Sequence, residues 1–134
     1  MRVLLRWMAV AAWAAVILAA ADESFSAESS GGWFRRLFGF DVPYALHILI
    51  RKLAHVVEYA VLGALALYAA RASFTRAATI AMTIALAVAA ADEWRQSLSP
   101  MRTGSAWDVL LDLAGAALGA WLLGAFPAAL RRRL

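Results

Sequence analysis

The sequence predicts an all-α membrane protein, built as a small bundle of four transmembrane helices. Hydrophobic residues make up 64% of its 134 residues, against about half in an ordinary soluble domain. These residues gather into four long apolar segments that are separated by short polar connections. A soluble domain of this size could not bury so much apolar surface, so a bilayer is the expected environment.

Each apolar segment is interpreted as one helix of a single domain that covers residues 1–134. The predicted helices span about 3–21, 44–70, 77–98 and 107–129. About 20 residues of helix are needed to cross the hydrocarbon core. The third segment reaches that length only by continuing through Asp92 to Leu98, which places polar residues in the last turns of a spanning helix.

The first segment has two interpretations. Arg2 and Arg6 precede an apolar stretch, and small residues come just before Asp22, which is also the layout of a secretory signal peptide. The stretch is long for a signal peptide and contains two Trp residues, which favours an uncleaved helix. Cleavage after Ala21 would leave a bundle of three helices.

Basic residues at the helix ends favour an orientation with both termini in the cytoplasm. The cytoplasmic set would be Arg2, Arg6, Arg71, Arg76 and Arg131 to Arg133. Basic residues on the other side are matched by acids, whereas these are not, and Arg and Lys are enriched in cytoplasmic loops. The longest connection, residues 22–41, alternates aromatic residues with Arg over 33–40, which fits an interfacial helix or an anchored loop equally well.

Several functional classes are excluded or disfavoured by composition. The chain has no Cys, which excludes disulfides and thiolate metal sites. Its net charge of +4 comes from residues at the ends of apolar segments, as topology signals do, so we expect no nucleic-acid binding. No phosphate-binding loop, dinucleotide fingerprint or nucleophile elbow is present, and no cofactor is required by the sequence.

The second segment carries a stripe of ionisable side chains. At roughly 100° per residue, one third of the helix circumference holds Arg51, Lys52, His55, Glu58 and Tyr59. The opposite face is expected to face lipid, and it holds Leu53, Val57, Ala60, Ala64 and Leu67. His47 is interpreted as an interfacial anchor off the stripe. Because ionisable groups inside a spanning helix are costly, they tend to face protein and to carry function.

Two further regions supply polar residues at the same depth. The third helix ends in Asp92, Glu93, Arg95 and Gln96, the following loop contains Arg102, and the fourth helix opens with Asp108 and Asp112. Because consecutive helices alternate in direction, all of them fall in the extracytoplasmic half, together with the stripe. Gly115 and Gly119 share the face of the two aspartates in a small-xxx-small pattern, which predicts that this face packs against other helices.

These motifs resemble those of the VanZ-like family. Residues 51–63 (RKLAHVVEYAVLG) resemble its first motif, and Asp92 to Gln96, Arg102 and residues 108–115 (DVLLDLAG) resemble later ones in the same order, so that the resemblance covers 51–119. The family usually has Asn where Asp112 stands and commonly Gly where Met101 stands. Asp112 makes the site of this chain more acidic.

The resemblance implies a small multi-pass protein of the bacterial cytoplasmic membrane. The family takes its name from a protein associated with lowered sensitivity to the glycopeptide teicoplanin. It implies no settled biochemical activity, so the resemblance supports a location in the cell envelope better than it supports a reaction.

The leading hypothesis is a pocket that binds an anionic envelope lipid or a cell-wall-related ligand. The predicted ligand-binding residues are Arg51, Lys52, His55, Glu58, Tyr59, Asp92, Glu93, Gln96, Arg102, Asp108 and Asp112. Arg binds phosphate and carboxylate groups in bidentate fashion, and Lys binds them as a point charge.

Two alternatives stay open. The first is a metal-dependent or acid/base hydrolase or transferase, for which the catalytic candidates are His55, Glu58, Asp92 and Glu93. The second is a network of ion pairs that only holds the helices together. The expected partners are the bilayer and the anionic lipid or cell-wall-related ligand. A homo-oligomer is possible, and the sequence does not determine the oligomeric state.

Overall fold

The protein is described by a computed structural model in which residues 1–20, 36, 39, 43–70, 72–98 and 105–125 are placed. Its helices are α1 (Arg2–Ala20), α3 (Tyr44–Ala70), α4 (Phe74–Ser97) and α5 (Ala106–Ala125). All four are long and apolar enough to cross a membrane, and the described residues contain no strand. The predicted fold class is therefore confirmed.

The helix bounds differ from the predicted ones mainly at α4. This helix begins at Phe74, three residues before the predicted start, because Ser73 precedes it with an extended backbone and its carbonyl already accepts the N–H of Ala77. Polar Thr75 and Arg76 are tolerated in the first turn. Ala21 and residues 126–129, which were predicted to be helical, lie outside the described residues, as does the 22–35 part of the aromatic connection.

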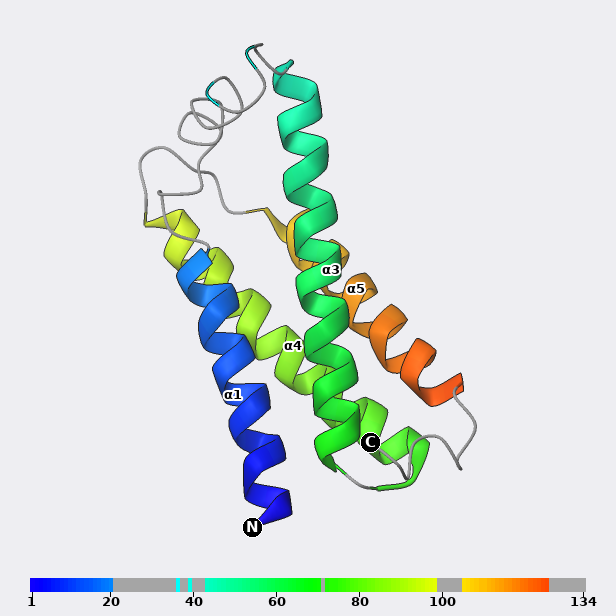
Figure 1. The fold of residues 1–134 in the computed structure, drawn as a ribbon. Coiled ribbons are helices and arrows are strands. Elements are labelled where there is room, and N and C mark those ends of the chain that lie inside the picture. The colour runs from blue at the N-terminus through cyan, green and yellow to red at the C-terminus, as the bar shows by residue number, and fades with distance from the viewer. Residues whose placement is uncertain (21–35, 37–38, 40–42, 71, 99–104, 126–134) are drawn as a thin grey trace.

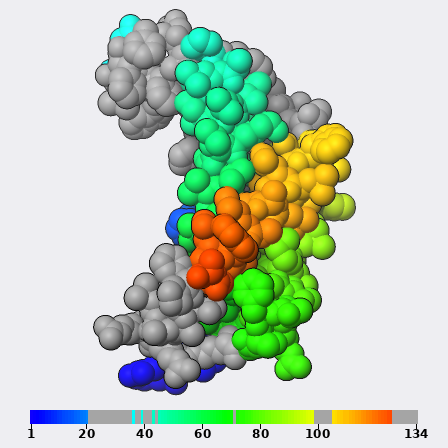
Figure 2. Space-filling view, turned by 90° about the vertical axis from the view of Figure 1, so that its right-hand side faces the viewer, coloured from blue at the N-terminus to red at the C-terminus, as the bar shows by residue number. Residues whose placement is uncertain are grey.

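The helices alternate in direction, so that α3 and α5 start at the same end of the bundle (Figure 1). Figure 2 shows α5 lying against α3 and α4, with the start of α3 extending beyond the start of α5. The orientation of this bundle relative to the cytoplasm stays a prediction.

Glycines allow α3 and α5 to approach until their backbones touch. A Cβ atom at Gly119 would lie 1.8 Å from the carbonyl oxygen of Ala60, and one at Gly63 would lie 2.1 Å from that of Ala116. At Gly115 the corresponding distance to the oxygen of Val56 is 2.6 Å. Since any side chain at these positions would collide with backbone, the seam depends on glycine, as close packing in lipid commonly does.

The structure corrects two expectations about α3. Ala60 faces α5, and Leu67 is buried, so neither belongs to a lipid-facing surface; Leu53 and Val57 are exposed as expected. His47, which was expected off the polar stripe, is buried at 8% exposure. Eleven residues at 100° each place His47 about 20° from Glu58 around the helix, so the stripe begins one turn earlier than expected.

The first helix packs into the bundle. Val10 and Ile17 of α1 are buried, and the indole Nε1 of Trp13 donates a hydrogen bond of 2.9 Å to the carbonyl oxygen of Glu58. At the end of α1, the guanidinium group of Arg95 donates to the carbonyl oxygen of Leu18. Arg95 thus caps a helix C-terminus, and a cleaved segment would take these contacts with it.

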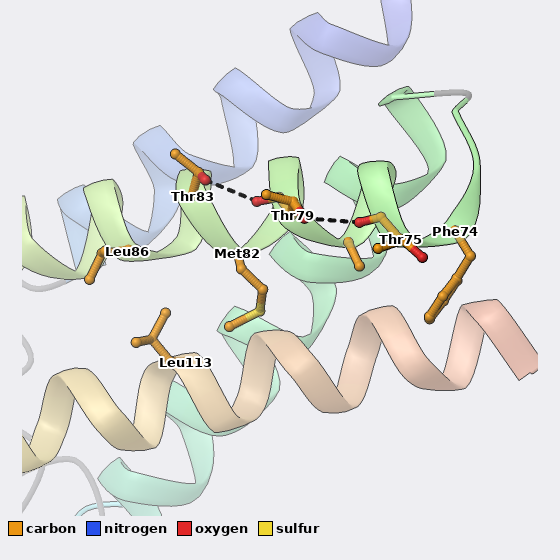
Figure 3. A pocket seen from close by; sticks show the side chains of 8 residues that line it. Phe74, Thr75, Thr79, Met82, Thr83, Leu86 and Leu113 are labelled. Atoms are coloured by element: carbon orange, nitrogen blue, oxygen red, sulfur yellow. Dashed lines mark hydrogen bonds between the residues drawn. The ribbon is translucent and has the colours of Figure 1, made fainter.

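A groove of about 540 Å³ runs between α4 and α5 and carries no ionisable side chain (Figure 3). Three threonines line its α4 side, and two of their hydroxyls bond to their own helix. The hydroxyl of Thr79 donates to the backbone oxygen of Thr75, and that of Thr83 donates to the backbone oxygen of Thr79. Because these hydroxyls are satisfied inside the helix, the groove presents mainly methyl groups. Its α4 lining runs from Phe74 to Leu86 and ends before Asp92.

The glycine seam yields a prediction for stability. Gly119→Val should destabilise the bundle by about 1–3 kcal/mol, the usual cost of overpacking, because the new side chain has to push Ala60 away. Ala117→Val is the matched control, since Ala117 lies two residues away on the exposed face of α5 and should leave stability nearly unchanged. Unfolding in mixed micelles measures both, and equal stabilities of the two variants would contradict the seam.

Candidate functional site

Two polar contacts join α3 to α5, one helical turn apart. The ammonium Nζ of Lys52 lies 2.6 Å from the carboxylate Oδ1 of Asp108. One turn further into the bundle, the imidazole Nδ1 of His55 lies 3.2 Å from Oδ1 of Asp112. Both contacts lie on the side of α3 that meets the glycine seam, so the close packing of the two helices fixes their geometry.

The two contacts differ in their access to the surroundings. The side chains of Lys52 and Asp108 are 49% and 33% exposed, whereas Asp112 is 1% exposed and His55 23%. The outer pair is therefore open to an incoming group and the inner pair is largely enclosed. A burial of this kind makes a carboxylate costly unless it is paired, and the imidazole of His55 supplies that partner.

Tyr59 continues the buried part of the site. Its ring stacks beside that of His55, with ring centroids 6.5 Å apart and an interplanar angle of 11°, and its side chain is fully buried. Among the described residues, no hydrogen-bond partner reaches the Tyr59 hydroxyl or Oδ2 of Asp112. Buried polar atoms are rarely left this way, so these two atoms point to a place for a water molecule or a polar ligand atom.

The end of α4 supplies a second buried carboxylate. Asp92 is 1% exposed, and the side-chain amide of Gln96 donates a hydrogen bond of 2.8 Å to its Oδ2. Glu93 instead contacts the backbone ahead of α5. Its Oε2 accepts a hydrogen bond of 2.5 Å from the backbone N–H of Ser105. Glu93 therefore holds the chain where it enters α5 and positions the helix that carries Asp108 and Asp112.

The basic residues do not all join the site. Arg51 stands next to Lys52 on α3 and is partly buried, and no described acid forms an ion pair with it. Arg95 turns away to α1, as described above. Arg102, a predicted ligand-binding residue, lies outside the described residues.

Most of the predicted residues meet at this end of the bundle. The carboxyl group of Glu58 lies within electrostatic range of His55, Asp92 and Asp112, which joins the α3 stripe to the buried acids. We use "polar site" for the following set: Arg51, Lys52, His55, Glu58, Tyr59, Asp92, Gln96, Asp108 and Asp112.

Some residues that support the polar site were not predicted from the sequence. Trp13 supports the site from outside by bonding to the backbone of Glu58, and nothing in its surroundings in the sequence signals that contact. Ser105 was visible in principle, since Ser ahead of an apolar helix is a common N-terminal residue.

Far from the polar site, the guanidinium of Arg6 lies 4.3 Å from the ring centroid of Tyr68. This cation–π contact joins α1 to the other end of α3.

The arrangement has two chemical capacities. Its outer cations can bind an anion, and an imidazole held through Nδ1 by a carboxylate can move protons through its other nitrogen. No group of three or more His, Asp or Glu side chains in the described part of the chain is placed to hold a metal ion. The metal-dependent alternative therefore has no geometric support among those residues.

Comparison with known proteins assigns the chain to a family. The model of the family described as VanZ/LLP1 matches residues 3–127, a much longer part of the chain than the motifs at 51–119. No curated protein and no solved structure matches the chain. The family predicted from the motifs is confirmed, and the protein is a member of the VanZ/LLP1 family.

Proposed function

We propose that the polar site binds the anionic head group of an envelope lipid or of a cell-wall-related ligand. One observation carries the proposal: two adjacent cations, Arg51 and Lys52, stand at the accessible end of an otherwise buried polar cluster. Arg and Lys are the usual partners of phosphate and carboxylate groups.

The depth of the polar site supports a ligand at the membrane surface. Trp94 near the end of α4 and Trp107 at the start of α5 are 69% and 77% exposed, and exposed Trp is enriched where a helix crosses the interface. Asp108 and Lys52 lie at this level, and Asp112 is one turn deeper. A lipid head group would reach the outer cations without leaving its leaflet. We place that leaflet on the extracytoplasmic side of the bacterial cytoplasmic membrane, as the charge pattern predicts.

A purely structural network explains less. It accounts for the contacts of Lys52 with Asp108 and of His55 with Asp112. It does not account for Arg51, which no described acid neutralises, or for the buried hydroxyl of Tyr59. Small residues at the seam already hold α3 and α5 together without charges.

Neutralising the outer cations should weaken lipid binding. Arg51→Gln and Lys52→Gln should each reduce the affinity for phosphatidylglycerol by about fivefold, which corresponds to about 1 kcal/mol for a partly exposed charge contact. Native mass spectrometry of the protein released from nanodiscs measures the retained lipid. Arg76→Gln is the control, because Arg76 is exposed at the other end of α4. If both site variants are folded and retain as much phosphatidylglycerol as the wild type, the proposal is refuted.

We further propose that this binding lowers sensitivity to teicoplanin-type glycopeptides, the role that the family name suggests. Expression in a susceptible host should raise the inhibitory concentration of teicoplanin, and the double variant of Arg51 and Lys52 to Gln should abolish the increase. Both proteins must be present in the membrane at equal amounts. If the double variant still raises the inhibitory concentration of teicoplanin, the resistance role does not depend on the polar site.

A further inference from the structure

We infer that Asp108 sets the charge specificity of the polar site, so that the site accepts a singly charged phosphodiester head group in preference to a doubly charged phosphomonoester. The inference rests on the proposed function and narrows its ligand class. It starts from the position of Asp108, whose Oδ1 stands where an oxygen of a bound anion would stand, 2.6 Å from Nζ of Lys52.

Asp108 neutralises one of the two outer cations. Arg51 and Lys52 contribute two positive charges, and the carboxylate of Asp108 removes one of them. Among these three outer groups, one positive charge remains to be balanced by a ligand. A phosphodiester, with one negative charge, matches that remainder.

The floor of the polar site opposes further negative charge. Asp112 lies four residues after Asp108, about 6 Å deeper along α5 at 1.5 Å per residue. The carboxyl group of Glu58 lies within electrostatic range of Asp112. Among the described residues, His55 contacts Asp112. A second negative charge on the ligand would meet these acids at close range, where Coulomb forces are weakly screened.

Asp108 cannot easily move aside to admit such a ligand. Its backbone N–H donates to the carbonyl oxygen of Ser105 at 2.9 Å, and the N–H of Ser105 is held by Glu93. Below it, Gly115 and Gly119 lock α5 against α3. In the first turn of a helix, a carboxylate is also favoured by the helix dipole, which supports the observed position of Asp108.

The test compares two lipids that differ in charge. Wild-type protein in nanodiscs is titrated with phosphatidylglycerol, a phosphodiester, and with phosphatidic acid, a phosphomonoester. The titration is run at pH 8, where a phosphomonoester with a second pKa near 6 carries two charges. The wild type should bind phosphatidylglycerol at least as tightly as phosphatidic acid.

Removing the charge of Asp108 should reverse this order. Asp108→Asn should tighten phosphatidylglycerol binding by up to about fivefold, the range open to an exposed ion pair. It should tighten phosphatidic acid binding more strongly, because the Coulomb repulsion that is removed is proportional to the charge of the ligand, which is twice as large. Asp108→Glu, which keeps the charge, should preserve the wild-type order, and Arg76→Gln controls for nonspecific charge effects. Asp108→Ser is the second neutral variant, since it removes the carboxylate and keeps a small polar side chain.

The outcomes separate the two proposals. If the wild type binds neither lipid, or if neither Arg51→Gln nor Lys52→Gln weakens binding, the proposed function itself fails. If the wild type binds and Lys52→Gln weakens binding, but both neutral variants of Asp108 leave the ratio of the two affinities unchanged, the charge specificity fails alone. A wild type that prefers phosphatidic acid would also overturn it.

Discussion

The direct contact between the backbones of α3 and α5 is the constraint on which the rest of this structure depends. It requires glycine at positions 63, 115 and 119, and it makes the two helices parallel neighbours although α4 lies between them in the chain. Because the helices run parallel, the third turn of α3, which carries Lys52, meets the first turn of α5, which carries Asp108. Packing therefore brings the polar residues of both helices together. Their charges need only avoid repulsion between the two helices.

Charge compatibility then explains the layering of the site. The outer contact of Lys52 with Asp108 is half-exposed and contributes little to stability. The inner contact of His55 with Asp112 is enclosed, so breaking it would leave an uncompensated buried group. Lys52 in the exposed layer can turn to a ligand at small cost while Asp108 stays in place. The buried layer keeps the helices in register. Acid/base chemistry by His55 is geometrically available, but nothing in the contacts favours it over binding.

The fold and the meeting of the polar regions could be predicted because they follow from hydropathy and alternating topology, which are local properties. The pairing of individual residues could not, since it depends on how far α3 and α5 slide past one another. Sequence reasoning thus placed Ala60 in lipid, whereas it packs on Gly119. It also did not predict that Glu93, one of the expected ligand-binding residues, accepts a hydrogen bond from the backbone of Ser105.

A double-mutant cycle on His55 and Asp112 tests the central claim that α3 and α5 join their polar faces. The free energy of unfolding is measured for His55→Gln, Asp112→Asn and the double variant, with Tyr68→Phe as a distant partner for Asp112→Asn. The structure predicts a coupling of at least about 0.5 kcal/mol for the first pair and none for the distant pair. Additive effects of His55→Gln and Asp112→Asn would show that the two helices do not meet as described.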